Sequence, residues 1–263
     1  MARRIAEGGF PLAVWARRAQ SVEPFRALAR IAASPAELGA LSDVVGVCVV
    51  ADGDVEDVLL GPDGIVSGMA PGAVVAIHST VHPETCSRVA EAAAARGVSV
   101  VDAPVSGGGP AAGTGELLVM VGGAQRDVAR CRPVFETFGR TVLHLGALGS
   151  GQVAKLLNNL VFTAQLAVAF DTFSFAERLG VDRGALAAVL TNGSGGSRAA
   201  TILASSDFDL GGLRGALPLL SKDVGRLHDL ARAGHVVEPA LLVELARRTF
   251  AELGGESTAA AKT

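Results

Sequence analysis

Hydrophobic and polar positions change their pattern once along this chain. Up to about residue 146, short apolar runs rich in β-branched residues alternate with longer amphipathic stretches. That alternation predicts βαβ units and a parallel sheet. After Gly149 the apolar positions recur only at helical spacing. We therefore expect an α/β domain over residues 1–146 and an all-helical domain over residues 147–263.

Individual elements follow from the same pattern. We expect strands at Leu12–Trp15, Val44–Val50, Ala73–Ile77, Ser99–Asp102, Leu117–Val121 and Thr141–Leu145. Helices are expected in the first half at Met1–Glu7, Pro24–Arg30, a segment capped by Ser34, Asp54–Leu60, Pro83–Arg96 and Arg126–Phe138, and in the second half at Ser150–Leu179, Arg183–Leu190, Ser197–Ala204, Leu219–Ala233 and Glu238–Leu253. The last ten residues are small and polar, and we expect them to be frayed.

The helix that begins at Ser150 is the longest expected element. Neither proline nor glycine occurs between Gly151 and Gly180, so the helix has about 30 residues and spans about 45 Å. Most of its circumference is apolar, which predicts burial. Lys155 and Asn159 are four residues apart and share one face, with Asn158 beside them. A lysine and two amides in an apolar helix indicate a functional role.

Composition makes Lys155 more notable. Of 23 basic residues only three are lysines, namely Lys155, Lys222 and the tail residue Lys262. Arginine keeps its proton in proteins, whereas burial can tune a lysine into an acid or a base. Lys155 and Lys222 are thus positions where arginine does not serve. The alternative is that these lysines survive an arginine bias by accident.

Other bulk properties exclude several classes of protein. The formal net charge of −3 gives no electrostatic basis for binding nucleic acid or an anionic membrane. Three widely spaced cysteines predict reduced, buried thiols in a cytoplasmic protein. We see no apolar run of membrane-spanning length, no signal peptide and no histidine pairing that predicts a metal site. The absence of tyrosine excludes a Tyr–Lys catalytic pair.

Four motifs in order resemble the β-hydroxyacid dehydrogenase family, which includes 3-hydroxyisobutyrate dehydrogenase, tartronate semialdehyde reductase and glyoxylate/succinic semialdehyde reductases. The resemblance covers nearly the whole chain. Its motifs are Ser79-Thr80 after a strand, Asp102-Ala-Pro-Val-Ser106-Gly107-Gly108, Gly149-Ser-Gly151-Gln-Val-Ala-Lys155-Leu-Leu-Asn158-Asn159, and Ser221-Lys222-Asp223. The resemblance implies a Rossmann-like domain that binds a nicotinamide dinucleotide, and a helical domain for substrate binding and dimerisation.

The resemblance also implies roles for particular residues. Lys155 matches the family's catalytic lysine, which exchanges a proton with the substrate oxygen as hydride moves to or from the nicotinamide. Asn159 would orient that lysine and the substrate. Ser106, Gly107 and Gly108 match the site for the substrate carboxylate, where glycines let backbone N–H groups approach an anion. An ordinary tight turn is the alternative for these three residues.

Cofactor contacts are expected at the carboxyl ends of the strands. Val50 and Ala51 follow one strand and Thr80 follows the next. Lys222 matches a lysine near the nicotinamide, and Asp223 beside it is a candidate substrate contact. Arg17 and Arg18 follow Leu12–Trp15 where an acidic residue would select NAD, so we expect NADP, with NAD possible. For these positions the alternatives are helix capping at Thr80 and solvent exposure of the basic residues.

The chain departs from the family at its start. Family members begin with a strand and a Gly-x-Gly-x-x-Gly turn, which lead into a helix that reads like Met1–Ile5. Loss of that central strand would leave its two neighbours unpaired. We expect either a start assigned too late or a chain with impaired pyrophosphate binding and an unstable α/β half.

Three hypotheses remain open. The first is an NADP-preferring dehydrogenase or reductase of small β-hydroxyacids or their semialdehydes, acting as a homodimer or homotetramer. The second is an imine reductase on the same scaffold, which Lys155 argues against. The third is a truncated, cofactor-free dimerising protein without activity. The side chains that select among substrates are not identified by the sequence, and neither is the direction of the reaction.

Overall fold

The computed structural model describes residues 1–254 and divides into two compact units, Met1–Lys155 and Leu156–Thr263. Each unit is described by itself. The last ten residues are expected to be frayed. Residues 255–263 of this segment lie outside the described part of the chain.

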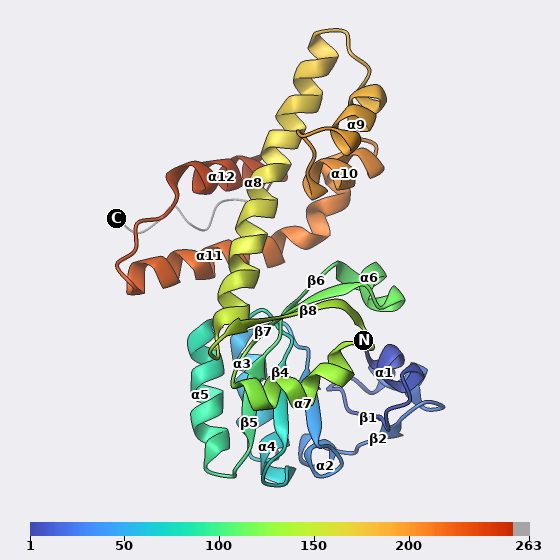
Figure 1. Cartoon of the computed structure of the whole chain (residues 1–263), viewed down its shortest axis with the longest axis vertical. Coiled ribbons are helices and arrows are strands. Elements are labelled where there is room, and N and C mark those ends of the chain that lie inside the picture. The colour runs from blue at the N-terminus through green and yellow to red at the C-terminus, as the bar shows by residue number, and fades with distance from the viewer. Residues whose placement is uncertain (255–263) are drawn as a thin grey trace. The chain divides into compact units, whose positions relative to one another are not determined.

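A six-stranded sheet forms the centre of the first unit (Figure 1). Its strands are β3 (Val44–Val47), β4 (Val74–Ile77), β5 (Ser99–Asp102), β6 (Val105–Ser106), β7 (Leu117–Gly122) and β8 (Gly139–Gly146). β3, β4 and β5 are parallel neighbours, and β8 is parallel to β7. β7 is antiparallel to both β5 and β6, so the sheet is mixed. Parallel pairing thus dominates, as the alternating pattern predicted.

Helices cover both faces of this sheet. They are α1 (Ala2–Glu7), α2 (Pro35–Ala40), α3 (Asp52–Leu60), α4 (Ile65–Gly68), α5 (Pro83–Ala94), α6 (Gly108–Thr114) and α7 (Gln125–Phe135). Successive residues of β4 point to opposite faces. Val75 and Ile77 belong to the apolar cluster that includes α3 and α5, whereas Val74 and Ala76 belong to the cluster that includes α7. Because both faces are buried, β4 reads as a continuous apolar run.

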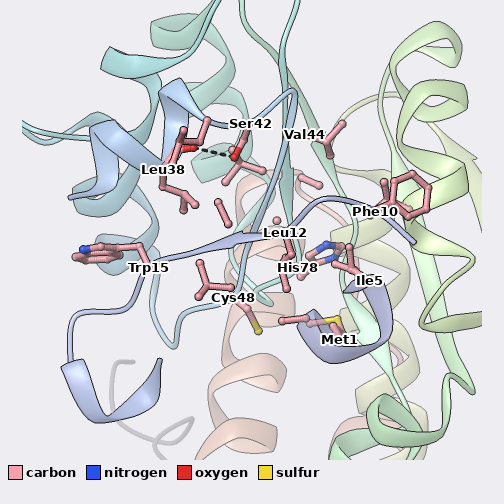
Figure 2. Close-up of a pocket in the computed structure, with 18 of the residues that line it drawn as sticks. Met1, Ile5, Phe10, Leu12, Trp15, Leu38, Ser42, Val44, Cys48 and His78 are labelled. Carbon is pink, nitrogen blue, oxygen red and sulfur yellow. Dashed lines mark hydrogen bonds between the residues drawn. The ribbon is translucent and has the colours of Figure 1, made fainter. Parts of the chain in front are cut away.

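A separate two-stranded parallel sheet is formed by β1 (Ala13–Val14) and β2 (Arg30–Ile31). Neither strand pairs with β3. Between β1 and β3 lies a cavity of about 640 Å³, mostly apolar and lined from both strands and from α1. Figure 2 shows Met1, Ile5, Leu12, Cys48 and His78 among the side chains that line this cavity. β1 and β3 thus both line this cavity and do not pair with each other.

Some predicted elements of the first unit were wrong or missed. The helix expected at Pro24–Arg30 is instead a short 3-10 turn, Glu23–Phe25, followed by β2. Backbone pairing with the preceding strand explains the difference, because the Arg30 N–H donates to the Leu12 carbonyl oxygen at 2.9 Å. The short elements α4, β6 and α6 were not predicted. By contrast, Ser34 caps α2 as expected, accepting from the Glu37 N–H at 3.1 Å.

Helices make up the regular structure described in the second unit. The long helix α8 (Ser150–Arg178) enters it from the first unit and is followed by α9 (Arg183–Asn192), α10 (Arg198–Ser205), the 3-10 segment η3 (Leu210–Ala216), α11 (Leu217–Ala233) and α12 (Ala240–Glu252). Leu166, Phe173 and Leu203 pack in one apolar cluster of this unit. Leu160 and Phe250 pack in a second cluster. All five predicted helices are present to within two or three residues at each end.

The expectation that the chain has no apolar run of membrane-spanning length does not hold for α8. By length and composition α8 is apolar enough to cross a membrane, with a window of mean hydropathy 1.4. Within that window 44% of the residues are buried inside the chain, and a core helix of a soluble protein passes the same test. The exposed fraction is at most 2% for each of Leu156, Leu160, Leu166 and Phe173. We therefore interpret α8 as a core helix.

His78, at the carboxyl end of β4, is expected to make the stability of the first unit depend on pH. Its imidazole is enclosed by Phe135 and Phe138, with ring centroids 5.4 and 5.5 Å away, and its Nδ1–H donates to the Ala103 carbonyl oxygen at 2.8 Å. Burial lowers the pKa of His78 to about 4. The unfolded chain takes up a proton near pH 6.5, before the folded chain does.

We expect the free energy of unfolding to fall by about 3 kcal/mol between pH 7 and pH 4 because of His78 alone. The contribution of this residue is complete above its unfolded pKa and is lost as the pH falls towards the folded value. Urea unfolding across this range measures the effect. In His78→Asn the amide keeps a donor near the Nδ1 position without titrating. If His78→Asn loses as much free energy of unfolding between pH 7 and pH 4 as the parent chain does, the loss is not caused by His78.

Candidate functional site

The amino-terminal end of α8 is held by a buried carboxylate at the end of β5. Asp102 is fully buried, and its Oδ1 accepts from the Gly149 N–H at 2.7 Å. Its Oδ2 accepts from the Gln152 N–H, also at 2.7 Å. The carboxylate thus satisfies N–H groups that have no partner within the helix and lies at the positive end of the helix dipole. Burial nevertheless raises the pKa of Asp102, and the hydrogen bonds oppose that rise.

Glycines make this close approach possible. A Cβ at Gly151 would lie 2.4 Å from the Met120 carbonyl oxygen and 2.8 Å from Asp102 Oδ2. A Cβ at Gly122, on β7, would lie 2.3 Å from Asp102 Oδ1. Gly149 has φ +93°, which only glycine adopts readily. The Gly149-Ser-Gly151 motif therefore allows the first turn of α8 to pack directly on the sheet.

Gln152, in that first turn, extends the arrangement to the loop after β4. Its side chain is fully buried. The Nε2 group donates to the Ser79 carbonyl oxygen at 2.9 Å, and Oε1 accepts from the Val81 N–H at 3.0 Å. Ser79 Oγ in turn accepts from the Val49 N–H at 2.7 Å. The loops that follow β3 and β4 are thus joined to α8, and Thr80 lies between the two residues that Gln152 contacts.

The candidate carboxylate turn lies between β6 and α6. Ser106 is half-buried and pairs in register with Leu118 of β7. Gly107 and Gly108 both have positive φ, +129° and +70°. A Cβ at Gly107 would lie 2.6 Å from the Ala111 Cβ, so both conformation and space require glycine there. The turn therefore leaves the backbone at Gly107 and Gly108 uncovered by side chains, so that a ligand can approach it closely.

Lys155 lies on α8 one turn beyond Gln152 and is half-buried. Asn159, one further turn on, is 8% exposed, and its Nδ2 donates to Asp223 Oδ2 at 2.7 Å. Asp223 is itself 3% exposed, and its Oδ1 lies 3.3 Å from Arg226 Nη1 and 3.5 Å from Lys222 Nζ. The second unit therefore contains a network of Asn159, Asp223, Lys222 and Arg226 in which two cations surround one buried carboxylate.

The other predicted cofactor contacts lie near the carboxyl ends of the strands. Val50 is 66% exposed, Ala51 is exposed and caps α3, and Thr80 is half-buried. Arg17 is also exposed, but its Nη2 donates to Asp54 Oδ1 at 2.9 Å on the surface. Arg18 beside it is exposed. The guanidinium of Arg17 holds the pKa of Asp54 below its usual range.

The structure also reveals features that the sequence analysis did not identify. Asp102 and Gln152 were quoted within motifs but given no role. A signal for Gln152 existed, because a third amide in an apolar helix, three residues before Lys155, needs a buried partner. Asp102 carried no comparable signal. The expectation of three buried thiols needs a correction, since Cys48 is exposed while Cys86 and Cys131 are buried; all three are free.

Two family models match the chain almost end to end. The model for the NAD binding domain of 6-phosphogluconate dehydrogenase matches residues 1–146. The model for NAD-binding of NADP-dependent 3-hydroxyisobutyrate dehydrogenase matches residues 149–262.

Individual relatives agree with these models. The chain is 37% identical over 206 residues to 3-hydroxyisobutyrate dehydrogenase of Pseudomonas aeruginosa, covering 74% of this chain and 68% of the relative. Its fold is similar to that of Mycobacterium tuberculosis 3-hydroxyisobutyrate dehydrogenase solved with L-serine, with a TM-score of 0.82, 26% identity and coverage of 97% of this chain and 90% of that chain. It is also similar to Psf3 in complex with NADP+ and 2-OPP, with a TM-score of 0.81, 25% identity and coverage of 97% and 91%. The chain therefore belongs to the β-hydroxyacid dehydrogenase family and is an NAD(P)-dependent oxidoreductase.

Proposed function

We propose that this protein transfers hydride between NADP and a small β-hydroxyacid or its semialdehyde, with Lys155 as general acid and base. The observation that carries the proposal is the first turn of α8, where Asp102 and Gln152 fix the backbone that presents Lys155. A half-buried lysine on a rigid turn suits proton transfer, which needs a fixed donor within hydrogen-bond reach of the substrate oxygen.

The proposed roles of the chain's own residues follow from their chemistry. The Lys155 Nζ donates a proton to the carbonyl oxygen during reduction and accepts it from the alcohol during oxidation. The nicotinamide, when bound, supplies or accepts the hydride. Asn159 is held by Asp223, which keeps its amide in one orientation for the substrate oxygen. Asp223 itself is a proposed substrate contact, and the neighbouring Lys222 a proposed cofactor contact.

The substrate carboxylate is proposed to bind at Ser106, Gly107 and Gly108. Two successive glycines with positive φ and a half-buried serine hydroxyl provide donors of the kind that bind a small anion. The relatives support an acid as substrate, since one is named for 3-hydroxyisobutyrate and the structure of another was solved with L-serine.

For the cofactor we propose NADP, bound at the carboxyl edge of β3 and β4 by Val50, Ala51 and Thr80. Arg17 and Arg18 follow β1, where a guanidinium suits a 2′-phosphate. Arg17 already pairs with Asp54 on the surface, a contact worth little in water, so a phosphate can compete for it. The neighbour solved with NADP+ supports the same preference.

A titration tests the cofactor proposal. Trp15 is the only tryptophan and lies two residues before Arg17, so its fluorescence reports on cofactor binding. We expect saturable binding of NADPH, with a Kd at least tenfold lower than that for NADH, and loss of the difference in Arg17→Ala/Arg18→Ala. The same titration on a chain extended before Met1 by an apolar strand and a glycine-rich turn is a second arm. Absence of NADPH binding in both arms, with the protein folded, would contradict the proposal.

We also propose that the second unit forms a homodimer, either alone or within a homotetramer. Leu157, Val161, Val168 and Phe175 recur at helical spacing along one face of α8, and Leu179 follows directly after its last residue; each of the five is at least 40% exposed. An exposed apolar stripe of this length marks an interface, and a second copy presents the same stripe to the first.

We expect Val168→Glu/Phe175→Glu to convert the dimer or tetramer to monomer, as measured by sedimentation velocity. Val189 is 63% exposed on α9, outside the stripe, so Val189→Glu serves as the control and is expected to leave the mass unchanged. A double variant with the assembly of the parent chain would show that the stripe is not the interface.

We propose that residues 1–146 bind the cofactor and that residues 147–263 bind the substrate and form the dimer. The separate family-model matches to residues 1–146 and 149–262 support this division. Three free cysteines support a reducing, cytoplasmic location.

A further inference from the structure

We propose that Gln152 is a positioning residue that fixes the cofactor loop around Thr80 relative to the turn of α8 that presents Lys155. The inference rests on the proposed function, because it assumes that Thr80 contacts the cofactor and that Lys155 transfers the proton. It assigns a task to a side chain that itself reaches neither substrate nor cofactor.

The contacts of Gln152 are directed at both sides of Thr80. Its amide nitrogen donates to the Ser79 carbonyl oxygen at 2.9 Å, and its amide oxygen accepts from the Val81 N–H at 3.0 Å. The backbone on either side of Thr80 is therefore held by one side chain. That side chain is fully buried, so water does not compete for these two hydrogen bonds.

The other end of the connection is equally fixed. The Gln152 backbone N–H donates to Asp102 Oδ2 at 2.7 Å, so the residue is held to β5 as well as to the loop. Lys155 follows three residues later in the same helix, about 4.5 Å further along its axis. A displacement of the Thr80 loop therefore displaces Gln152, and with it the turn that carries the lysine.

Glutamine meets both hydrogen-bonding requirements at position 152, and the residues nearest to it in size or shape do not. Glutamate offers the acceptor for the Val81 N–H but no donor for the Ser79 carbonyl oxygen. Asparagine is one methylene shorter, and methionine fills a similar volume without either hydrogen bond. A buried glutamine that merely filled space would be replaceable by methionine without a functional effect.

The test compares Gln152→Met with Gln165→Met, which makes the same chemical change at a half-buried position of α8. Fluorescence titration is expected to give an NADPH Kd about tenfold or more higher in Gln152→Met and unchanged in Gln165→Met. Thr80→Ala is then combined with Gln152→Met. If Gln152 acts through the Thr80 loop, the two effects on Kd are not additive. Additive effects, or an unchanged Kd in Gln152→Met, would overturn the proposal.

A second measurement separates this inference from the proposed function. Amide hydrogen exchange of the protein without cofactor is expected to show faster exchange at Val81 in Gln152→Met and no change in Gln165→Met. If the parent chain binds no NADPH, the proposed function fails, and unchanged Val81 exchange then separately refutes the positioning contact. If Gln152→Met does not fold, Gln152→Glu takes its place: it retains the acceptor for the Val81 N–H but loses the donor to the Ser79 carbonyl oxygen. We then expect a higher NADPH Kd in Gln152→Glu than in the parent chain, and an unchanged Kd would overturn the proposal.

Discussion

Replacing Lys155 with methionine is expected to lower kcat by about 10²–10⁴-fold, the usual contribution of a positioned general acid or base. Methionine retains the apolar stem of lysine and removes the titrating amine. Because Lys155 lies inside the regular helix α8, in its second turn, and is only half-buried, we expect α8 to persist. Steady-state kinetics, with NADPH titration and thermal unfolding as controls for folding, measure the effect.

Lys155→Arg makes the prediction more specific. Arginine keeps the positive charge and much of the length but does not release its proton. If Lys155 acted only by attracting an anionic substrate, the arginine variant would keep most of its kcat. If Lys155 transfers a proton, both variants lose kcat to a similar extent while the NADPH Kd stays within about twofold. Full activity in Lys155→Arg would exclude the proton-transfer role.

The second large effect is expected on stability, in Asp102→Ala. The substitution leaves the Gly149 and Gln152 N–H groups buried without their acceptor. An unsatisfied buried donor costs about 1–3 kcal/mol, so two cost about 2–6 kcal/mol. Burial raises the pKa of Asp102, so burying its ionised form is itself unfavourable. Removing the carboxylate therefore offsets part of the cost of about 2–6 kcal/mol from the unsatisfied N–H groups. We therefore expect a loss of about 3 kcal/mol, a large share of a typical total of about 5–15.

Asp182→Ala is the matched control for Asp102. Asp182 caps α9 by accepting from the Ala185 N–H at 2.8 Å, but it is exposed. Water can replace its oxygen, so the expected loss is about 1 kcal/mol. Chemical unfolding of both variants measures the difference. Equal losses in the two variants would show that Asp102 acts as an ordinary helix cap and does not hold α8 to the sheet.

The long helix and the central strands were predictable because local patterns determine them. The helix expected at Ser150–Leu179 is α8, Ser150–Arg178, since glycines mark both ends. The strand expected at Ser99–Asp102 has the same bounds in the structure. The helix expected at Pro24–Arg30 was wrong because β2 depends on pairing with β1, a contact between residues far apart in the sequence.

The site was predictable in its parts but not in its connections. Lys155, Asn159 and the Ser106 turn could be named from motifs, and their roles stay predictions. The hydrogen bonds that join Asp102 to Gln152, and Gln152 to Ser79 and Val81, link residues up to 73 positions apart. No local pattern encodes such a pair, because each partner is compatible with many others until the fold brings them together.

The measurement that tests the central claim most directly is hydride transfer by the purified chain. NADP+ is mixed with 3-hydroxyisobutyrate, L-serine and other small hydroxyacids, and reduced nicotinamide is followed by its absorbance; NADPH with the corresponding semialdehydes gives the reverse reaction. We predict turnover with at least one acid and its loss in Lys155→Met. A folded chain that binds NADPH but transfers no hydride in either direction, or one that turns over equally well without Lys155, would contradict the account.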